Sequence, residues 1–369
     1  MDIKSVKTDC LHFLGYIPCK PNKNHGVHCT EQNGSACKYY LPSGKRILII
    51  KLGAAGDVIR TTPLLYPLRK KYLNAHITWL THSPELVPHV SDTENGANLI
   101  LNYDDKSVSV IRNSNYDVII NLDKDLYACA LAKEKDNAAE IFGYTLVNNN
   151  PFPVNESAIP KYITGIFDDI SIANTKSYLQ ELFEICGFKF NNEEYLLPKH
   201  EPGSGFDIDK SKTVVGLNTG CGGRWTSRLW PIDSWLELIE LLKNASYEVV
   251  LLGGPEEHEK NTSLRLKTEV KYFGAMSLKK FVGLMNETDI VVSAVTMGMH
   301  IAIGLKKPLV LLNNIFNKNE FELYGKGVIV EPEKKCTCYF RPTCINPDYK
   351  CIDYIFPKKV FESVTKLQK

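Results

Sequence analysis

The sequence of 369 residues has almost no excess of charge of either sign, because 44 lysines and arginines face 42 aspartates and glutamates for a formal net charge of +2. It contains no long basic or acidic block, which argues against nucleic acid as a partner. No apolar run approaches the roughly 20 residues of a membrane span, and residues 1–9 lack the core of a signal peptide. We therefore expect a cytoplasmic protein with at most peripheral membrane contact.

The sequence also lacks the fingerprint of a dinucleotide-binding turn. Residues 46–51 form a short apolar run that predicts a buried parallel strand. The turn after it, residues 53–56, has the form G-x-x-G instead of G-x-G-x-x-G, and the next strand ends without an acidic residue. This excludes a nicotinamide site by pattern. The small residues still let a ligand approach the strand end, where Asp57 is a candidate for chemistry; a plain helix cap is the alternative.

The length and the alternation of strands with helices predict two α/β domains with complete cores. Strands are predicted in the first half at 46–51, 76–81, 99–102 and 116–122, and in the second at 213–217, 248–252, 290–293 and 309–313. Helices are predicted at 176–186, 232–244, 277–285, 296–305 and 357–367. We expect a GT-B-like pair of facing, doubly wound, Rossmann-like domains with a cleft between them. The expected parts are a cysteine-rich extension (1–44), the first domain (45–205), the second domain (206–335), and a cysteine-rich loop with a closing helix (336–369).

Eight of the 11 cysteines fall into two groups at the ends of the chain. These are Cys10, Cys19, Cys29 and Cys37, and Cys336, Cys338, Cys344 and Cys351. In a reducing compartment two such groups indicate metal and not a disulfide framework. Four thiolates suit structural zinc or iron and leave no open position for a substrate. Free thiols are the alternative for the first group, where His12, His25 or His28 could also replace one ligand.

Three further stretches carry polar residues at predicted strand ends. Residues 219–228 combine glycines and hydroxyls with Arg224 and Arg228, which favours binding of an anion such as a diphosphate over a mobile surface loop. Residues 296–300 begin a helix whose N-terminus would favour the same anion, although His300 alone is more often structural. Asp123 and Asp125 form a D-x-D that suggests a metal only weakly, and a polar loop near the acceptor is the preferred interpretation.

These motifs together resemble glycosyltransferase family 9, the heptosyltransferases, from residue 45 to about 316. The matching stretches are K-L-G-A-A-G-D-V-I-R-T-T-P-L-L, N-T-G-x-G-x-R-W-x-S-R-x-W-P and V-T-M-G-M-H-I-A-I-G-L-K-K-P. The resemblance implies an inverting enzyme without a catalytic metal, with Asp57 as the base in one domain and Arg228 gripping the donor diphosphate in the other. The candidate donor-binding residues are Thr219, Gly220, Arg224, Trp225, Arg228, Thr296, Met297 and His300.

One departure from the family concerns the donor sugar. Many heptosyltransferases have D-T-G-x-S-H where this chain has V-T-M-G-M-H, so a carboxylate that would contact a hydroxyl is missing. The cysteine-rich ends resemble a subgroup that includes the autotransporter heptosyltransferases, in which C-terminal cysteines hold a metal. We expect transfer of a sugar, heptose from ADP-heptose in the first instance, to a saccharide or protein acceptor in cell-surface glycan or lipopolysaccharide-type biosynthesis. A nucleotide-sugar hydrolase or epimerase, a non-catalytic assembly protein and a homo-oligomer remain open.

Overall fold

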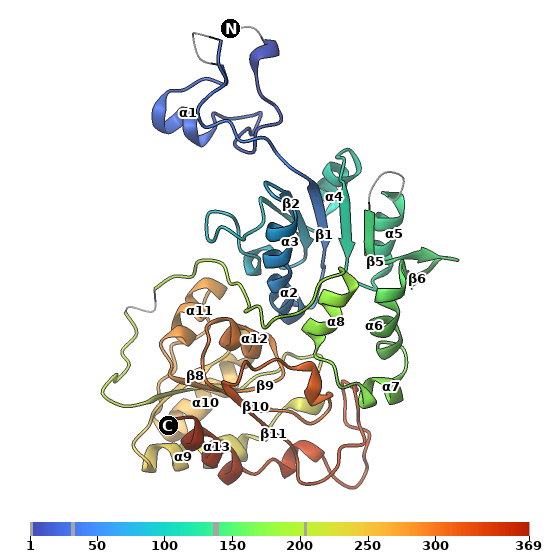
Figure 1. Cartoon of the computed structure of the whole chain (residues 1–369). Coiled ribbons are helices and arrows are strands. Elements are labelled where there is room, and N and C mark those ends of the chain that lie inside the picture. Colours follow the sequence, from blue (N-terminus) through green and yellow to red (C-terminus); the bar gives the residue numbers. More distant parts are fainter. Residues whose placement is uncertain (1–2, 31–33, 136–139, 203–204, 369) are drawn as a thin grey trace. The chain divides into compact units, whose positions relative to one another are not determined.

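The computed structural model describes residues 3–30, 34–135, 140–202 and 205–368. The chain forms two compact α/β units, each built on a largely parallel sheet (Figure 1). The first unit holds Met1–Leu52, Leu64–Pro84 and His89–Val154, and the second holds Gly53–Pro63, Glu85–Pro88 and Asn155–Lys369. The predicted fold class, two α/β units with parallel sheets, is confirmed.

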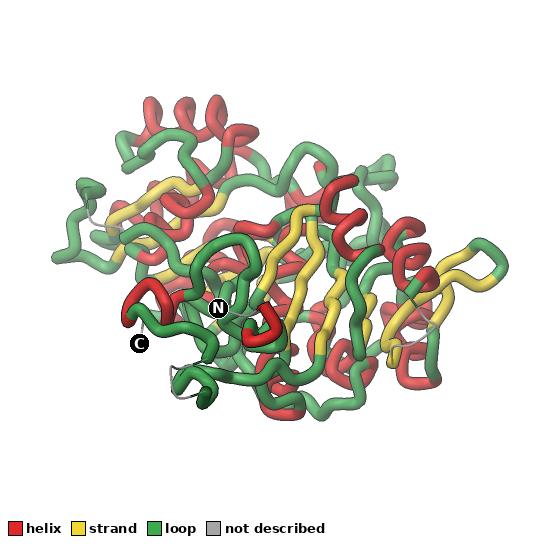
Figure 2. The backbone as a smooth tube through the Cα atoms, turned by 90° about the horizontal axis from the view of Figure 1, so that it is seen from above, coloured by secondary structure: helices red, strands yellow, loops and turns green. Residues whose placement is uncertain are grey.

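The sheet of the first unit has the order β3-β2-β1-β4-β5-β6. Its strands are β1 (Arg46–Ile50), β2 (His76–Thr81), β3 (Leu99–Asn102), β4 (Val118–Asn121), β5 (Glu140–Val147) and β6 (Asn150–Pro153). Every neighbouring pair is parallel except β5 with β6, which form a hairpin that extends from the sheet edge (Figure 2). The sequence predicted the first four strands, and the hairpin was missed.

Three helices accompany this sheet: α3 (Leu65–Lys71), α4 (Asp105–Arg112) and α5 (Leu126–Glu134). Leu48 and Ile50 of β1 share one buried cluster with Ala128 and Leu131 of α5, so the apolar run of β1 is explained by burial against a helix. The N-terminal extension contains only α1 (Lys20–His25) and a 3₁₀ turn (Ile3–Ser5) among its described residues.

The sheet of the second unit has the order β11-β10-β9-β7-β8, and all its pairs are parallel. Its strands are β7 (Val214–Asn218), β8 (Glu248–Leu252), β9 (Ile290–Ala294), β10 (Leu309–Leu312) and β11 (Gly327–Val330). The helices are α9 (Ile232–Asn244), α10 (His258–Thr268), α11 (Leu278–Asn286), α12 (Met297–Gly304) and α13 (Pro357–Leu367). Helices α9, α10 and α13 cover one face through a shared apolar cluster, and α11 and α12 lie on the other (Figure 1).

Four helices that precede this sheet in sequence also belong to the second unit: α2 (Ala55–Thr61), α6 (Ile159–Thr164), α7 (Asp168–Ala173) and α8 (Tyr178–Ile185). The compact units therefore divide the chain at residue 155, whereas the sequence suggested a division after 205. The stretch in question is anchored by an ion pair between Glu194 and Lys306 and by Leu197, which packs against Gly304. No helix of the described ranges is both long and apolar enough to cross a membrane.

Candidate functional site

A pocket of about 770 Å³ lies in the second unit, next to the carboxyl ends of β7 and β9. Five stretches together with Phe281 and Phe340 line it, and all of them belong to this one unit: 54–60, 218–228, 254–257, 295–300 and 316–321. Open parallel sheets bind ligands at this edge, because the loops that leave the strands are free to vary there. The pocket is therefore the candidate functional site.

Most of the predicted catalytic and donor-binding residues line this pocket, namely Asp57, Gly220, Trp225, Arg228, Thr296, Met297 and His300. Two do not. The hydroxyl of Thr219 is buried and donates to Oδ1 of Asn261 at 2.6 Å. Arg224 is exposed, with its guanidinium 5.7 Å from the ring centroid of Trp225. The structure therefore separates the two arginines of this motif and brings only Arg228 into the pocket.

Asp57 reaches the pocket because helix α2 packs closely against α12. A Cβ at Gly56 would come within 2.5 Å of the His300 ring, so only glycine allows this approach. Asp57 stands within the first turn of α2, whose N-cap is Ala54 without a side-chain cap. The cap interpretation of Asp57 is therefore wrong. Its carboxylate instead pairs with Arg60, with 2.8 Å between Oδ1 of Asp57 and Nη2 of Arg60.

Arg228 is a buried guanidinium that is held by backbone carbonyls. It donates to the carbonyl oxygens of Val295 and, at 3.2 Å, of Cys221. Burial lowers the pKa of Arg228 to about 10, and among the described residues no carboxylate contributes a compensating charge. Its positive charge lies on the pocket wall, where an anionic ligand would supply the missing partner.

The turn that carries Arg228 is attached to the C-terminal cysteine loop. Ser227 donates its backbone N–H to the carbonyl of Pro342 at 3.0 Å and its hydroxyl to the carbonyl of Arg341 at 2.7 Å. Thr226 also donates to Pro342. The hydroxyls expected to bind the anion are therefore used within the protein. These bonds of Thr226 and Ser227 to the C-terminal loop fix the position of the neighbouring Arg228.

Several pocket residues were missed by the sequence analysis. Glu256 accepts from the N–H of Gly223 at 2.8 Å, and Glu257 fills the space beside Gly220 that a Cβ would occupy. Both follow β8 after two glycines and a proline, so the rule that ligands bind at strand ends could have found them. Arg60, Phe316, Glu320, Phe321 and Phe340 also line the pocket but gave no such signal.

The D-x-D motif of the first unit has structural partners. Asp123 accepts from the buried Lys51 ammonium and from the N–H of Leu52, which ties the end of β1 to the end of β4. Asp125 caps α5 by accepting from the N–H groups of Tyr127 and Ala128. These contacts favour a structural interpretation of both carboxylates over a metal site.

The cysteines of each terminal group lie near one another. Sγ of Cys338 is 3.5 Å from Sγ of Cys344, and the thiol of Cys336 hydrogen-bonds Cys351. Cys10, Cys19, Cys29 and Cys37 all line one cavity of about 280 Å³ in the N-terminal extension, together with His12 and His28. Within the ranges that the structure describes, however, no three Cys, His, Asp or Glu side chains are arranged to hold a metal ion.

Comparison with known proteins gives one matching family and similar solved structures. The sequence model of "Glycosyltransferase family 9 (heptosyltransferase)" matches residues 106–350. A family 9 glycosyl transferase from Veillonella parvula is 19% identical, with a TM-score of 0.67 over 88% of this chain and 97% of that one. The ADP-heptose lipopolysaccharide heptosyltransferase II of E. coli is 18% identical, with a TM-score of 0.60 over 87% and 98%.

A third similar structure is TibC of enterotoxigenic E. coli, described as an iron-containing dodecameric glycosyltransferase. It is 12% identical, with a TM-score of 0.55 over 89% of this chain and 77% of that one. At these identities the three structures show a shared fold. A comparison with curated protein sequences gives no match.

His300 makes the stability of the second unit depend on pH. Burial and the nearby Arg60 lower the pKa of His300 to about 3, against an opposing effect of Asp57, whereas an unfolded histidine has a pKa of about 6.5. Between about pH 3 and 6.5, His300 is therefore protonated in the unfolded chain and neutral in the folded chain. The stabilisation is complete above about pH 6.5 and is lost as pH falls toward 3. About 2 kcal/mol of it has been lost at pH 5.

We expect His300→Gln to flatten the decline in urea stability between pH 7 and 5. Tryptophan fluorescence in a Trp79→Phe background measures it, because the other tryptophans, 225, 230 and 235, all lie in the second unit. His258→Gln, at an exposed position of the same unit, is the control. A decline in His300→Gln as steep as in the parent would contradict the prediction.

Proposed function

Because the chain belongs to glycosyltransferase family 9 and is therefore a glycosyltransferase, we propose that its pocket binds a nucleotide sugar and that the transferred sugar is heptose from ADP-heptose. The acceptor is a saccharide or a protein in cell-surface glycan or lipopolysaccharide-type biosynthesis. One observation carries the proposal: Arg228, a buried cation without a carboxylate partner in the described ranges, shares a pocket of about 770 Å³ with Asp57. A diphosphate would supply the missing negative charge.

The proposed chemistry assigns one task to each of these residues. Asp57 takes the proton of the acceptor hydroxyl while the oxygen of that hydroxyl bonds to the anomeric carbon from one side. The bond from that carbon to the diphosphate breaks on the other side, and Arg228 stabilises the charge that the leaving group gains. The N-terminus of α12 adds its partial positive charge, and no catalytic metal is needed in this scheme. Residues 206–335 form the proposed donor part of the chain and 45–205 the acceptor part.

The thiol groups at both ends remain proposed sites for structural zinc or iron. Cysteine sulfur is a ligand that zinc and iron prefer, which supports this proposal. Backbone N–H groups that point at sulfur also support it: that of Cys338 donates to Sγ of Cys336 at 3.3 Å, and that of Ile345 to Sγ of Cys338 at 3.3 Å. Asn314 donates to Sγ of Cys351 at 3.2 Å. TibC, which shares the fold, is described as iron-containing and dodecameric, and this supports iron and a homo-oligomer as parts of the proposal.

The donor and the base are tested together. We expect one nucleotide sugar of a panel to raise the melting temperature, since ligand at 100 times its Kd adds about 2.7 kcal/mol of stability. With that donor, Asp57→Ala should lower turnover by about 100-fold or more and leave donor affinity nearly unchanged. Asp105→Ala, in the first turn of α4 and outside the pocket, is the matched control. Near-normal turnover of a folded Asp57→Ala variant would refute the assignment.

Arg228 is tested by donor affinity. Losing hydrogen bonds from a charged group costs about 1.5–3 kcal/mol, so Arg228→Ala should weaken donor binding by about 10- to 100-fold and also lower turnover. Arg228→Lys should keep part of both, because it keeps the charge and loses the paired geometry. Arg224→Ala, four positions earlier and exposed, should bind the donor normally. If Arg224→Ala loses affinity and Arg228→Ala does not, the role belongs to Arg224.

Elemental analysis of protein purified without added metal tests the cysteine sites. We expect zinc or iron near one ion per cysteine group, and the double variant Cys338→Ala/Cys344→Ala should lose the C-terminal share. Because the loop of that group bonds to Thr226 and Ser227, metal loss there should also weaken donor binding. Cys186→Ala, outside both groups, is the control. Finding neither zinc nor iron, with all eight thiols freely titratable in the folded protein, would refute metal binding by the cysteine groups.

A further inference from the structure

Arg60 occupies a fixed and largely buried position beside Asp57. Its side chain is only 12% exposed, and its guanidinium carbon lies 3.3 Å from the ring centroid of Tyr178. Nε is buried without a hydrogen-bond partner among the described residues, so the two terminal nitrogens carry its polar contacts. One of them reaches Oδ1 of Asp57 at 2.8 Å. The arginine can therefore hold this carboxylate both ionised and oriented.

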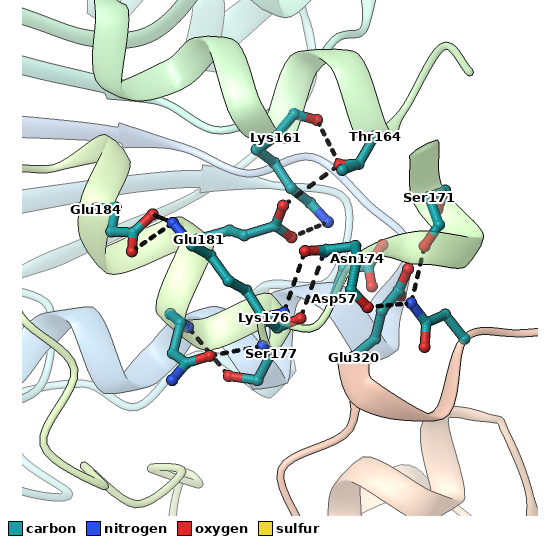
Figure 3. A network of polar contacts seen from close by, with 12 residues as sticks. Asp57, Lys161, Thr164, Ser171, Asn174, Lys176, Ser177, Glu181, Glu184 and Glu320 are labelled. Carbon is teal, nitrogen blue, oxygen red and sulfur yellow. Dashed lines mark hydrogen bonds and ion pairs between the residues drawn. The ribbon is translucent and has the colours of Figure 1, made fainter. Parts of the chain in front are cut away.

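A second carboxylate faces the same guanidinium. Oε2 of Glu320 lies 3.9 Å from the other terminal nitrogen of Arg60, and the Glu320 side chain is 14% exposed. Both carboxylates thus pair with the one guanidinium, and Figure 3 labels Asp57 and Glu320 among the surrounding polar side chains. The turn that carries Glu320 is fixed by Asn317, whose amide donates to the carbonyls of Ser171 at 2.8 Å and Asn174 at 2.7 Å. Figure 3 labels Ser171 and Asn174. The positive charge of Arg60 is thus shared by two carboxylates, those of Asp57 and Glu320.

Two titratable groups packed around Asp57, His300 and Tyr195, are uncharged near neutral pH. Burial lowers the pKa of His300 on α12 to about 3, so its ring is neutral. Burial raises the pKa of Tyr195, whose hydroxyl lies 3.5 Å from that ring. Behind Tyr178, Lys161 is 4.7 Å from the ring centroid and is itself paired with Glu181 at 2.7 Å. Arg60 and Glu320 therefore place one positive and one negative charge beside Asp57 in a single ion-pair network.

We propose that Arg60 and Glu320 are positioning residues that jointly set how readily Asp57 accepts a proton, an inference that rests on the proposed role of Asp57 as the base. In the resting site Arg60 keeps Asp57 ionised. When the acceptor O–H bond breaks and its proton moves to Asp57, the guanidinium loses one of its two counter-charges. Glu320 then remains to balance it, so no uncompensated buried charge forms during the transfer.

The proposal requires opposite effects of the two neighbours on the titration of Asp57. The probe is the ¹³C resonance of the Asp57 carboxyl carbon in the full chain, assigned by its disappearance in Asp57→Asn. Arg60→Gln should raise the midpoint by about 1–3 pH units, because an adjacent cation favours the ionised form by that amount. Arg60→Lys should keep the midpoint near that of the parent. In the Arg60→Gln background, adding Glu320→Gln should lower it again by about 1 unit, because one negative charge is removed.

Glu322→Gln in the same background is the matched control. It removes the same charge two positions further along the chain, and Glu322 lies outside the pocket lining and accepts instead from the N–H of Tyr324. It should leave the midpoint where Arg60→Gln puts it. Should Arg60→Gln melt too early to titrate, Glu320→Gln in the parent decides, and it should lower the midpoint.

Two results would overturn the inference: midpoints that do not move, or equal shifts from Glu320→Gln and Glu322→Gln. The proposed function fails separately, through near-normal turnover of Asp57→Ala. The two failures are distinguishable, because the resonance reports on the charges around Asp57 and turnover reports on whether Asp57 acts as the base.

Discussion

The contact between helices α2 and α12 is the constraint on which the candidate site depends. It exists because Gly56 has no side chain: a Cβ there would lie 2.5 Å from Cδ2 of His300. That approach brings α2 into the second compact unit, although the strand before it, β1, belongs to the first. It also buries His300 and gives Asp57 a place in the same pocket as Arg228. A bulkier residue at position 56 would separate the proposed base from the proposed donor site.

Two buried arginines in this pocket have opposite surroundings, and this difference organises its electrostatics. Arg60 faces two carboxylates, and the net effect of burial and of these charges raises its pKa. Arg228 has only carbonyl partners within the described ranges, so burial lowers its pKa. A buried charge without a partner is energetically costly unless a ligand supplies the opposite charge. The first arginine is therefore suited to tuning a carboxylate and the second to gripping an anion.

The C-terminal stretch supports the second arginine from behind. After the cysteine loop the chain returns to the unit through Ile355, whose carbonyl accepts from Nε1 of Trp230 at 2.9 Å, and through α13, which packs on α9. The loop itself bonds to Ser227 and contributes Phe340 to the pocket. The cysteines thus lie in a segment that shapes the proposed donor site. The proposed structural metal at these cysteines would therefore affect donor binding.

The sequence by itself determined the elements with strong local signals. Apolar runs such as 46–51 and 248–252 gave the parallel strands, and Ser277 and Thr296 marked helix starts because their hydroxyls cap the following N–H groups. The glycine-rich stretch that begins directly after β7 was found because it follows a strand, and Arg228 stands at the end of that stretch. The order of three motifs also gave the family, which the match to residues 106–350 confirms.

Only the tertiary structure decided which of these residues meet. Arg60 and Glu320 are far apart in sequence and stand at unremarkable positions, and a guanidinium finds its carboxylate through packing and not through spacing. Thr219 and Arg224 share a motif with Arg228 yet turn away, because neighbouring residues of a loop point in different directions and compete for partners within the protein. The assignment of α2 to the second unit likewise depends on its long-range contacts with α12 and α8. Local pattern fixes what a residue can do, and the long-range contacts fix what it faces.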